Sequence, residues 1–349
     1  MYINSIEDID SLGENEGISD INGIAREFNC RIYDIRPLRA VHVVQTDRGT
    51  MILKECSRDP DKILYSHGLK EHLYNNGFEN IDRYELSIYD LPFVIRQNRV
   101  FVMEKYINGR ECSFTNPYDR EKIVKALADM HNRGEGYVPG TGAARRNNLG
   151  RWDRAYLKKI NDLSYFKQLA AHKRKKSRFD KDFLSDVDFF IEMGWKGYDT
   201  LRRSDYHEIC RQGEEEKVIC HHDYTYHNII IDDCGRVSVI DFDYSCHELP
   251  VYDLSALIMK VLKRFNYDID IAIDMINHYC RVAPLEDGQL ALMLSLFEFP
   301  QRFWRISERY YSGKDHWSES IFLKKYNDII VMKEFIKDYT ENFRRILGL

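Results

Sequence analysis

The stretch CHHDYTYHNIIIDDCGRVSVIDFDYS, residues 220–245, determines how the rest of this chain is interpreted. It begins with a polar, histidine-rich loop and continues with two short runs of mostly β-branched residues, at 229–231 and 237–240. The sequence Asp-Cys-Gly at 233–235 separates the two runs and is typical of a turn, so the spacing predicts a β-hairpin. The second strand of that hairpin ends on Asp241.

Polar residues of this segment have the order and spacing of a kinase catalytic loop and metal motif. His221-x-Asp223-x-x-x-x-Asn228 matches the loop, and Asp241-Phe242-Asp243 follows the hairpin, where kinases keep a metal-holding Asp. Phosphoryl transfer needs a positioned hydroxyl, a carboxylate that accepts its proton, and Mg²⁺ on the phosphate oxygens. We therefore predict Asp223 as the base and Asn228 and Asp241 as Mg²⁺ ligands. Asp243 is either a second metal contact or a structural hydrogen-bond partner, and His221 is expected to pack and hydrogen-bond this catalytic loop.

Composition limits the classes of protein that need to be considered. At roughly 150 residues per domain, 349 residues correspond to about two domains. The net charge of −5 argues against a dedicated nucleic-acid binder. No stretch approaches the roughly 18 apolar residues of a membrane span, and the acidic start MYINSIEDID does not resemble a secretory signal. The 8 cysteines form no C-x-x-C pair, which predicts reduced thiols in the cytoplasm.

The first 106 residues are predicted to form a small β-rich, nucleotide-binding lobe after a helical lead-in at 1–29. Alternating patterns predict strands at 30–36, 41–46, 50–56, 93–96 and 99–106, and a helix at 61–76. Lys54 lies near the end of the third strand, and a lysine there needs a partner if it is buried. Glu71 is the only glutamate of the following helix, so we predict a Lys54–Glu71 pair. Glu104 and Tyr106 lie where a hinge strand would present backbone groups to adenine.

Residues 107–349 are predicted to form a mainly helical lobe that contains the catalytic loop 221–228 and the metal motif 241–243. Helices are expected at 121–133 and 253–265, across a highly charged region at 150–216, and as two long aromatic-rich helices in the last 60 residues. Asp253 either caps its helix or supports the catalytic loop, and both roles can hold. Trp304, Tyr310 and Tyr311 are expected to belong to an aromatic core rather than to a substrate pocket.

The sequence resembles the aminoglycoside phosphotransferase and choline kinase-like superfamily, and within it the CotS-type spore coat proteins. The resemblance rests on HHDYTYHNIII at 221–231, VIDFDYS at 239–245 and VYDLS at 251–255, with weaker support from MILKEC at 51–56 and VMEKYINGREC at 102–112. It implies an α+β, protein-kinase-like fold. A small antiparallel β-sheet lobe with one helix would precede a larger helical lobe, with ATP between them. It also implies that Asp253 supports the catalytic loop.

The resemblance further implies an ATP- and Mg²⁺-dependent transfer of the γ-phosphoryl group to a hydroxyl of a small molecule or sugar. Lys54, Glu71, Glu104 and Tyr106 would bind the nucleotide, in a protein of the cytoplasm or the spore coat. The stretch RPLRAV at 36–41 lacks the glycines with which kinases cover phosphates, although Arg39 could compensate by its charge. This departure favours the alternative, a catalytically weak or inactive structural or binding component of the spore coat, with other coat proteins as partners.

A zinc hydrolase is a third alternative, because cysteines and histidines crowd residues 220–247. No pair among them has zinc-finger spacing, and bound metal in the purified protein would be needed to support this function.

Overall fold

A computed structural model describes residues 20–57, 59–313 and 315–349. The chain divides into two compact units, which we describe separately. The first unit comprises Met1–Glu111, Val138–Arg146 and Asn228–Asp243, and the second comprises Cys112–Tyr137, Asn147–His227 and Tyr244–Leu349. Helix α1, Ile21–Glu27, is the described part of the predicted lead-in, whose residues 1–19 lie outside the described chain. The predicted boundary between the two lobes, at residues 106 and 107, stays a prediction.

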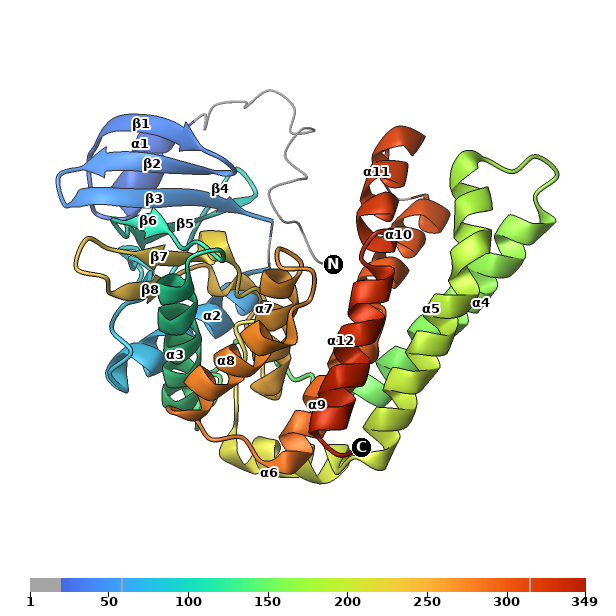
Figure 1. The fold of residues 1–349 in the computed structure, drawn as a ribbon. Coiled ribbons are helices and arrows are strands. Elements are labelled where there is room, and N and C mark those ends of the chain that lie inside the picture. The colour runs from blue at the N-terminus through green and yellow to red at the C-terminus, as the bar shows by residue number, and fades with distance from the viewer. Residues whose placement is uncertain (1–19, 58, 314) are drawn as a thin grey trace. The chain divides into compact units, whose positions relative to one another are not determined.

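The first unit is built on a five-stranded antiparallel sheet with the order β1-β2-β3-β5-β4 (Figure 1). Its strands are β1 (Ile32–Leu38), β2 (Val41–Thr46), β3 (Gly49–Cys56), β4 (Val94–Arg96) and β5 (Arg99–Lys105). All five were expected from the alternating pattern of the sequence, and helix α2 (Pro60–Asn75) follows the third strand as predicted. The predicted α+β fold is confirmed.

Apolar residues cover both faces of this sheet, because successive side chains of a strand point to opposite sides. Met51 and Leu53 of β3 pack in a buried cluster with Phe28, which directly follows α1. On the other face, Cys56 packs with Ile63 of α2 in a second cluster. Lys54 has the same parity as Cys56, so it lies on the face that α2 covers.

A second, three-stranded antiparallel sheet of the first unit holds the predicted hairpin. Its strands are β6 (Arg110–Glu111), β7 (Ile229–Ile231) and β8 (Val237–Val239), in that order. Gly109, in the predicted connection before β6, has φ +151°, and a Cβ there would lie 2.7 Å from the carbonyl oxygen of Ile231. Glycine is needed at this position because β7 passes so close.

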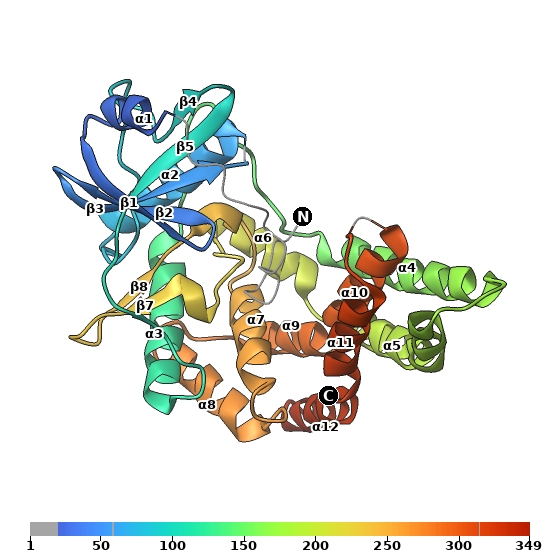
Figure 2. The ribbon, with the colours of Figure 1, turned by 90° about the horizontal axis from the view of Figure 1, so that it is seen from above.

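The second unit consists almost entirely of helices, seen well in Figure 2. They are α3 (Pro117–Gly134), α4 (Trp152–His172), α5 (Arg178–Arg203), α6 (Tyr206–Glu216), α7 (Val251–Leu262), α8 (Ile269–Cys280), α9 (Asp287–Glu298), α10 (Gln301–Ser312), α11 (Glu319–Ile330) and α12 (Lys333–Ile346). None of these helices, nor either of those described in the first unit, is long and apolar enough to cross a membrane.

The prediction of two long helices in the last 60 residues was wrong, because three helices follow α9 there. Helix α10 ends at Ser312, because Gly313 after it has φ +64° and takes the chain out of the helix, and a break at 331–332 separates α11 from α12. The aromatic residues do form a core, as predicted. Tyr310 stacks on Phe179 at 3.9 Å and Tyr311 on Phe166 at 5.2 Å, measured between ring centroids.

Candidate functional site

Lys54 joins the two carboxylates of the predicted metal motif. Its Nζ lies 3.1 Å from Oδ1 of Asp241 and 2.8 Å from Oδ2 of Asp243. The predicted Lys54–Glu71 pair is wrong, because the Glu71 carboxylate binds the Arg83 guanidinium, with 2.8 Å between Oε1 and Nε. Glu71 directly follows Lys70, which is fully buried. Successive side chains of a helix are rotated by about 100°, so Glu71 points away from the buried side of α2.

The charges of this group fit a cation site made of hard oxygen ligands. Burial opposes the charge on Lys54, but Asp241 and Asp243 outweigh this effect and hold its pKa well above the ordinary value. Two carboxylates therefore face one ammonium group, so the three side chains together carry a net negative charge. Carboxylate oxygens are ligands that Mg²⁺ prefers, so the donor set suits the predicted metal.

A second lysine forms a buried ion cluster next to this motif. Lys70 of α2 has no exposed surface, and its Nζ lies 2.8 Å from Oε1 of Glu104 and 3.0 Å from Oδ1 of Asp82. The ammonium group also stands 3.9 Å from the ring centroid of Tyr84. Burial, and after it the charge of Glu104, raises the pKa of Asp82 to about 7 against the lowering effect of Lys70. Glu104, predicted to bind the nucleotide, is thus a partner of Lys70.

The ion cluster fixes the backbone of the metal motif 241–243. The N–H of Asp241 donates to Oδ2 of Asp82 at 2.9 Å, and Asp241 has φ +64°, a conformation uncommon for residues other than glycine. Ser66 and Arg146 donate to the carbonyl oxygens of the next two residues of the motif, at 3.1 and 2.7 Å. Three side chains therefore each hold one backbone group, and these groups belong to the three consecutive residues of the motif.

Sequence reasoning missed these supporting residues. Lys70 lies seven residues after Ile63 and so falls on the apolar stripe of α2. A lysine on an apolar stripe needs a buried counter-charge, so its position in the sequence could have indicated a buried ion pair. Asp82 and Arg146 lie in irregular segments of the sequence, where no periodic pattern could indicate their partners.

In the second unit, Asp253 holds the start of the catalytic loop. Its two carboxylate oxygens accept the backbone N–H groups of His221 and His222, at 2.6 and 2.9 Å. His131 of α3 lies 3.4 Å away through Nε2, and its Nδ1 is 2.7 Å from the Tyr279 hydroxyl. Burial opposes ionisation of Asp253, but the hydrogen bond and the charges from these histidines outweigh it and lower its pKa to about 2.

Asp223 lies in the same loop, partly exposed. Its N–H donates to Nδ1 of the buried His221 at 3.3 Å, so His221 packs and hydrogen-bonds inside the loop. A cation lies close to it: the Nζ of Lys260 of α7 is 3.8 Å from Oδ1 of Asp223 and donates to the carbonyl oxygen of Tyr224 at 3.0 Å. The predicted base therefore carries an adjacent positive charge that sequence reasoning missed.

The remaining predicted residues take varied positions. Asn228 is buried at the end of the short turn Tyr226–Asn228, and its carbonyl oxygen accepts the N–H of Ile240 at 3.0 Å. Tyr106 is half-buried directly after β5. Arg39, in the glycine-free turn after β1, has φ +54° and lies 2.6 Å from Glu111. The charge of Arg39 is thus partly neutralised within the first unit.

The crowding of cysteines and histidines does not produce a convincing zinc centre in the described chain. Cys220, His131 and Asp253 place one potential ligand atom each within 4.8 Å of one another, all buried. The Cys220 sulfur contacts the carbonyl oxygens of Glu248 and Leu249, and burial raises the pKa of its thiol well above the ordinary value. Both carboxylate oxygens of Asp253 already accept backbone N–H groups of the catalytic loop, so we assign this trio to support of the loop.

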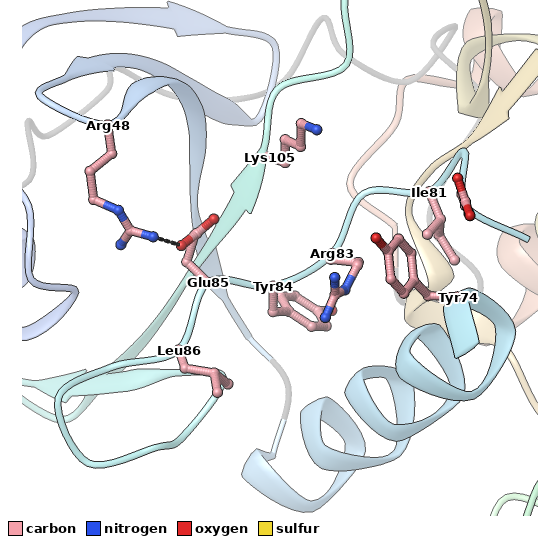
Figure 3. A pocket seen from close by; sticks show the side chains of 9 residues that line it. Arg48, Tyr74, Ile81, Arg83, Tyr84, Glu85, Leu86 and Lys105 are labelled. Carbon is pink, nitrogen blue, oxygen red and sulfur yellow. Dashed lines mark hydrogen bonds and ion pairs between the residues drawn. The ribbon is translucent and has the colours of Figure 1, made fainter. Parts of the chain in front are cut away.

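A pocket of about 400 Å³ opens elsewhere in the first unit (Figure 3). Charged and aromatic side chains line it, including Arg48, Glu85, Tyr74 and Lys105. Figure 3 shows the Arg83 guanidinium next to the Tyr74 ring, 4.0 Å from its centroid. None of the predicted site residues lines this pocket, so it carries no part of the function proposed below.

The Lys70 cluster leads to a stability prediction. Replacing Lys70 with Met should lower the free energy of unfolding by about 3–5 kcal/mol, because two buried carboxylates lose their counter-charge. Lys62→Met is the matched control on the same helix, since Lys62 forms an exposed pair with Asp59 and its loss should cost at most about 1 kcal/mol. Denaturant unfolding measures both, and equal small losses would contradict the prediction.

Asp253 leads to a prediction of pH dependence. Its pKa is about 2 in the folded protein and roughly 3.9 in an unfolded chain, so its ionised form stabilises the fold above the unfolded value. We expect this contribution, on the order of 2 kcal/mol, to be lost as the pH falls from about 4 through 2. Unfolding free energies of wild type and Asp253→Asn should therefore converge below pH 4, whereas a constant difference from pH 6 to 2 would refute this.

The chain is similar in sequence to known spore coat proteins. The chain is 23% identical over 314 residues to spore coat protein S of Bacillus subtilis (strain 168), covering 88% of this chain and 89% of that protein. It is also 23% identical over 218 residues to the endospore coat-associated protein YutH of the same organism, covering 62% of each. The predicted resemblance to spore coat proteins is confirmed.

Solved structures show the same fold. An aminoglycoside phosphotransferase from Alicyclobacillus acidocaldarius superposes with a TM-score of 0.82 at 17% identity, over 94% of this chain and 96% of that one. The AMP-bound spectinomycin phosphotransferase APH(9)-Ia gives 0.67 at 12% identity, over 90% and 96%. Residues 22–343 match the family model described as "Spore coat putative kinase YutH". The chain therefore belongs to the family described as "Spore coat putative kinase YutH" and has the fold of the aminoglycoside phosphotransferases.

Proposed function

We propose that this protein transfers the γ-phosphoryl group of Mg·ATP to a hydroxyl of a small molecule or sugar. The observation that carries the proposal is the contact of Lys54 with both Asp241 and Asp243, at 3.1 and 2.8 Å. A lysine on the central strand of a small sheet and two acids after a hairpin are the groups that phosphoryl transfer uses to hold phosphates and Mg²⁺.

The first unit would hold the nucleotide. Asp241, Asp243 and Asn228 supply the oxygen atoms for Mg²⁺, which would neutralise charge on the phosphates when bound. Lys54 supplies a cation for the phosphate oxygens. The chain after Glu104, through Tyr106, supplies backbone groups for adenine. An AMP-bound relative and an amicoumacin kinase in complex with AMP-PNP and Ca²⁺ share the fold, which supports nucleotide binding.

The second unit would supply the base. Asp223 accepts the proton of the acceptor hydroxyl, and the contact of His221 with the Asp223 amide keeps the loop in one conformation. The carboxylate of Asp223 is partly exposed, so it is accessible to a small hydroxyl compound. Lys260 lies next to it, with its Nζ 3.8 Å from Oδ1.

A structural or binding role in the spore coat is the second candidate. Arg39, in the glycine-free turn, is paired with Glu111 rather than presented alone, which weakens the case for strong phosphate binding by that turn. The names of the two Bacillus relatives support an association with the spore coat. A kinase-fold protein that binds Mg·ATP without turnover would fit this role.

Paired substitutions of the two acids test the proposal. Asp241→Asn removes a charge from the metal site, so Mg²⁺-dependent ATP binding should weaken by roughly tenfold or more. Lys54→Ala should weaken it too, whereas the exposed Lys62→Ala should not. Asp223→Asn should leave Mg·ATP affinity nearly unchanged and lower turnover by roughly 10²-fold or more. Calorimetry gives the affinities, and release of ADP in the presence of hydroxyl acceptors gives the turnover.

The outcomes separate the candidates. Mg·ATP binding without turnover of any acceptor would favour the coat component. Loss of Mg·ATP binding in Asp223→Asn with normal binding in Asp241→Asn would show that the two roles are wrongly assigned.

A further inference from the structure

Strand β1 is an exposed edge of the five-stranded sheet. It stands at one end of the strand order and pairs with β2 alone, so none of the described strands covers its outer edge (Figure 1). Its first residue is half-buried and the remaining ones are exposed. Tyr33 is 70%, Ile35 39% and Leu38 46% exposed, and large apolar side chains on an open edge favour pairing with another strand.

Ile35 and Pro37 direct their backbone groups to this open edge. Leu38 and Val41 close a two-residue turn as a hydrogen-bonded pair, and such pairs alternate along an antiparallel ladder. Leu38 and Arg36 therefore direct their N–H and C=O groups toward β2, and the residues next to them direct theirs outward. Pro37 agrees with this assignment, because proline is tolerated in an edge strand where its missing N–H would face away from the sheet.

Two opposite charges flank Ile35 on the strand. Asp34 precedes it and Arg36 follows it, and both are exposed. Among the described residues, neither side chain has an ion-pair or hydrogen-bond partner. Because side chains alternate along a strand, the carboxylate and the guanidinium lie on the same face, and Ile35 lies on the opposite face. A strand that pairs with this edge therefore meets one negative and one positive charge.

We propose that β1 pairs with β1 of a second copy of this chain, antiparallel and with Ile35 opposite Ile35 of that copy. In this register Asp34 of each copy lies opposite Arg36 of the other, so two cross-strand ion pairs form. The outward N–H and C=O groups of the two Ile35 residues exchange two hydrogen bonds. The partner is identified by charge complementarity, because the strand is complementary to itself.

The two charges also select this register over its neighbours. Moving the centre of the pairing by one residue keeps outward backbone groups opposite one another. Centring it on Asp34 would place two carboxylates directly opposite each other, and centring it on Arg36 would do the same with two guanidinium groups. Only the centre at Ile35 sets each charge opposite its counter-charge.

The pairing is expected to be short and weak. The register of β1 against β2 is irregular between Ile32 and Asp34, and Pro37 has no N–H to donate. Both features confine the regular part of the new ladder to the residues around Ile35. Small interfaces are typical of transient association, so we expect a dimer with a dissociation constant on the order of 100 µM.

Sedimentation of the full chain tests the pairing. Over concentrations from about a tenth to ten times the expected dissociation constant, the average mass should rise from that of a monomer toward that of a dimer. Added salt should weaken the association, because ions screen the exposed charges.

Charge reversals connect the dimer to β1. Asp34→Arg and Arg36→Asp should each raise the dissociation constant by roughly tenfold or more, because each sets like charges opposite one another twice. Combining both changes in one chain should restore the dimer, and so should an equal mixture of the two single variants, since opposite charges meet again. The matched control is Glu79→Arg at an exposed residue outside the strands, which should leave the association unchanged.

The outcomes are distinct. Monomers at every concentration would leave the edge to a strand of another protein and overturn the proposal. A dimer that both single reversals leave unchanged would place the contact elsewhere on the chain and overturn it too. Weakening without rescue, in the combined variant and in the mixture, would refute the register centred on Ile35. None of these measurements uses ATP, so a failure here leaves the proposed phosphotransferase function intact.

Discussion

The buried Lys70 ammonium group is the interaction on which the organisation of the first unit depends. It lies between Asp82 and Glu104 and so connects helix α2, the segment before β4 and strand β5. A fully buried ion pair is costly to form and costly to break, because removing one partner leaves an uncompensated charge in a poorly solvated interior. The pairing therefore specifies one arrangement of these three segments. Through Asp82, that arrangement extends to the metal motif.

A buried carboxylate holds the backbone of the metal motif 241–243, and another holds the backbone of the catalytic loop in the same way. Asp82 accepts the N–H of Asp241, and Asp253 accepts the N–H of His222. Both donors are non-glycine residues with positive φ, +64° at Asp241 and +70° at His222. Such conformations cost energy unless the surroundings enforce them. In each unit, a buried carboxylate hydrogen-bonded to the strained residue stabilises the loop geometry from which the chemistry would proceed.

The distribution of charge differs between the two units in a way that matches their proposed roles. In the first unit, Lys54 faces two carboxylates, an excess of negative charge that suits a divalent cation. In the second unit, Lys260 of α7 places a cation 3.8 Å from Asp223, so the predicted base and its neighbour carry opposite charges. Motif spacing predicts the acidic residues of both units, but packing decides which cations lie beside them.

The sequence by itself determined the features that depend on neighbours along the chain. Spacing made Asp223, Asn228 and Asp241 candidates for the site, and runs of strand-forming residues with turn residues between them predicted the strands and the hairpin, since these patterns are local. Tertiary structure decided which charges pair. The contact of Lys54 with Asp241 spans 187 residues, and the apolar stripe of α2 could mark Lys70 as buried but not name Asp82 and Glu104 as its partners. Burial decides such choices, because a charged group taken from water must find its partner wherever the fold brings one within reach.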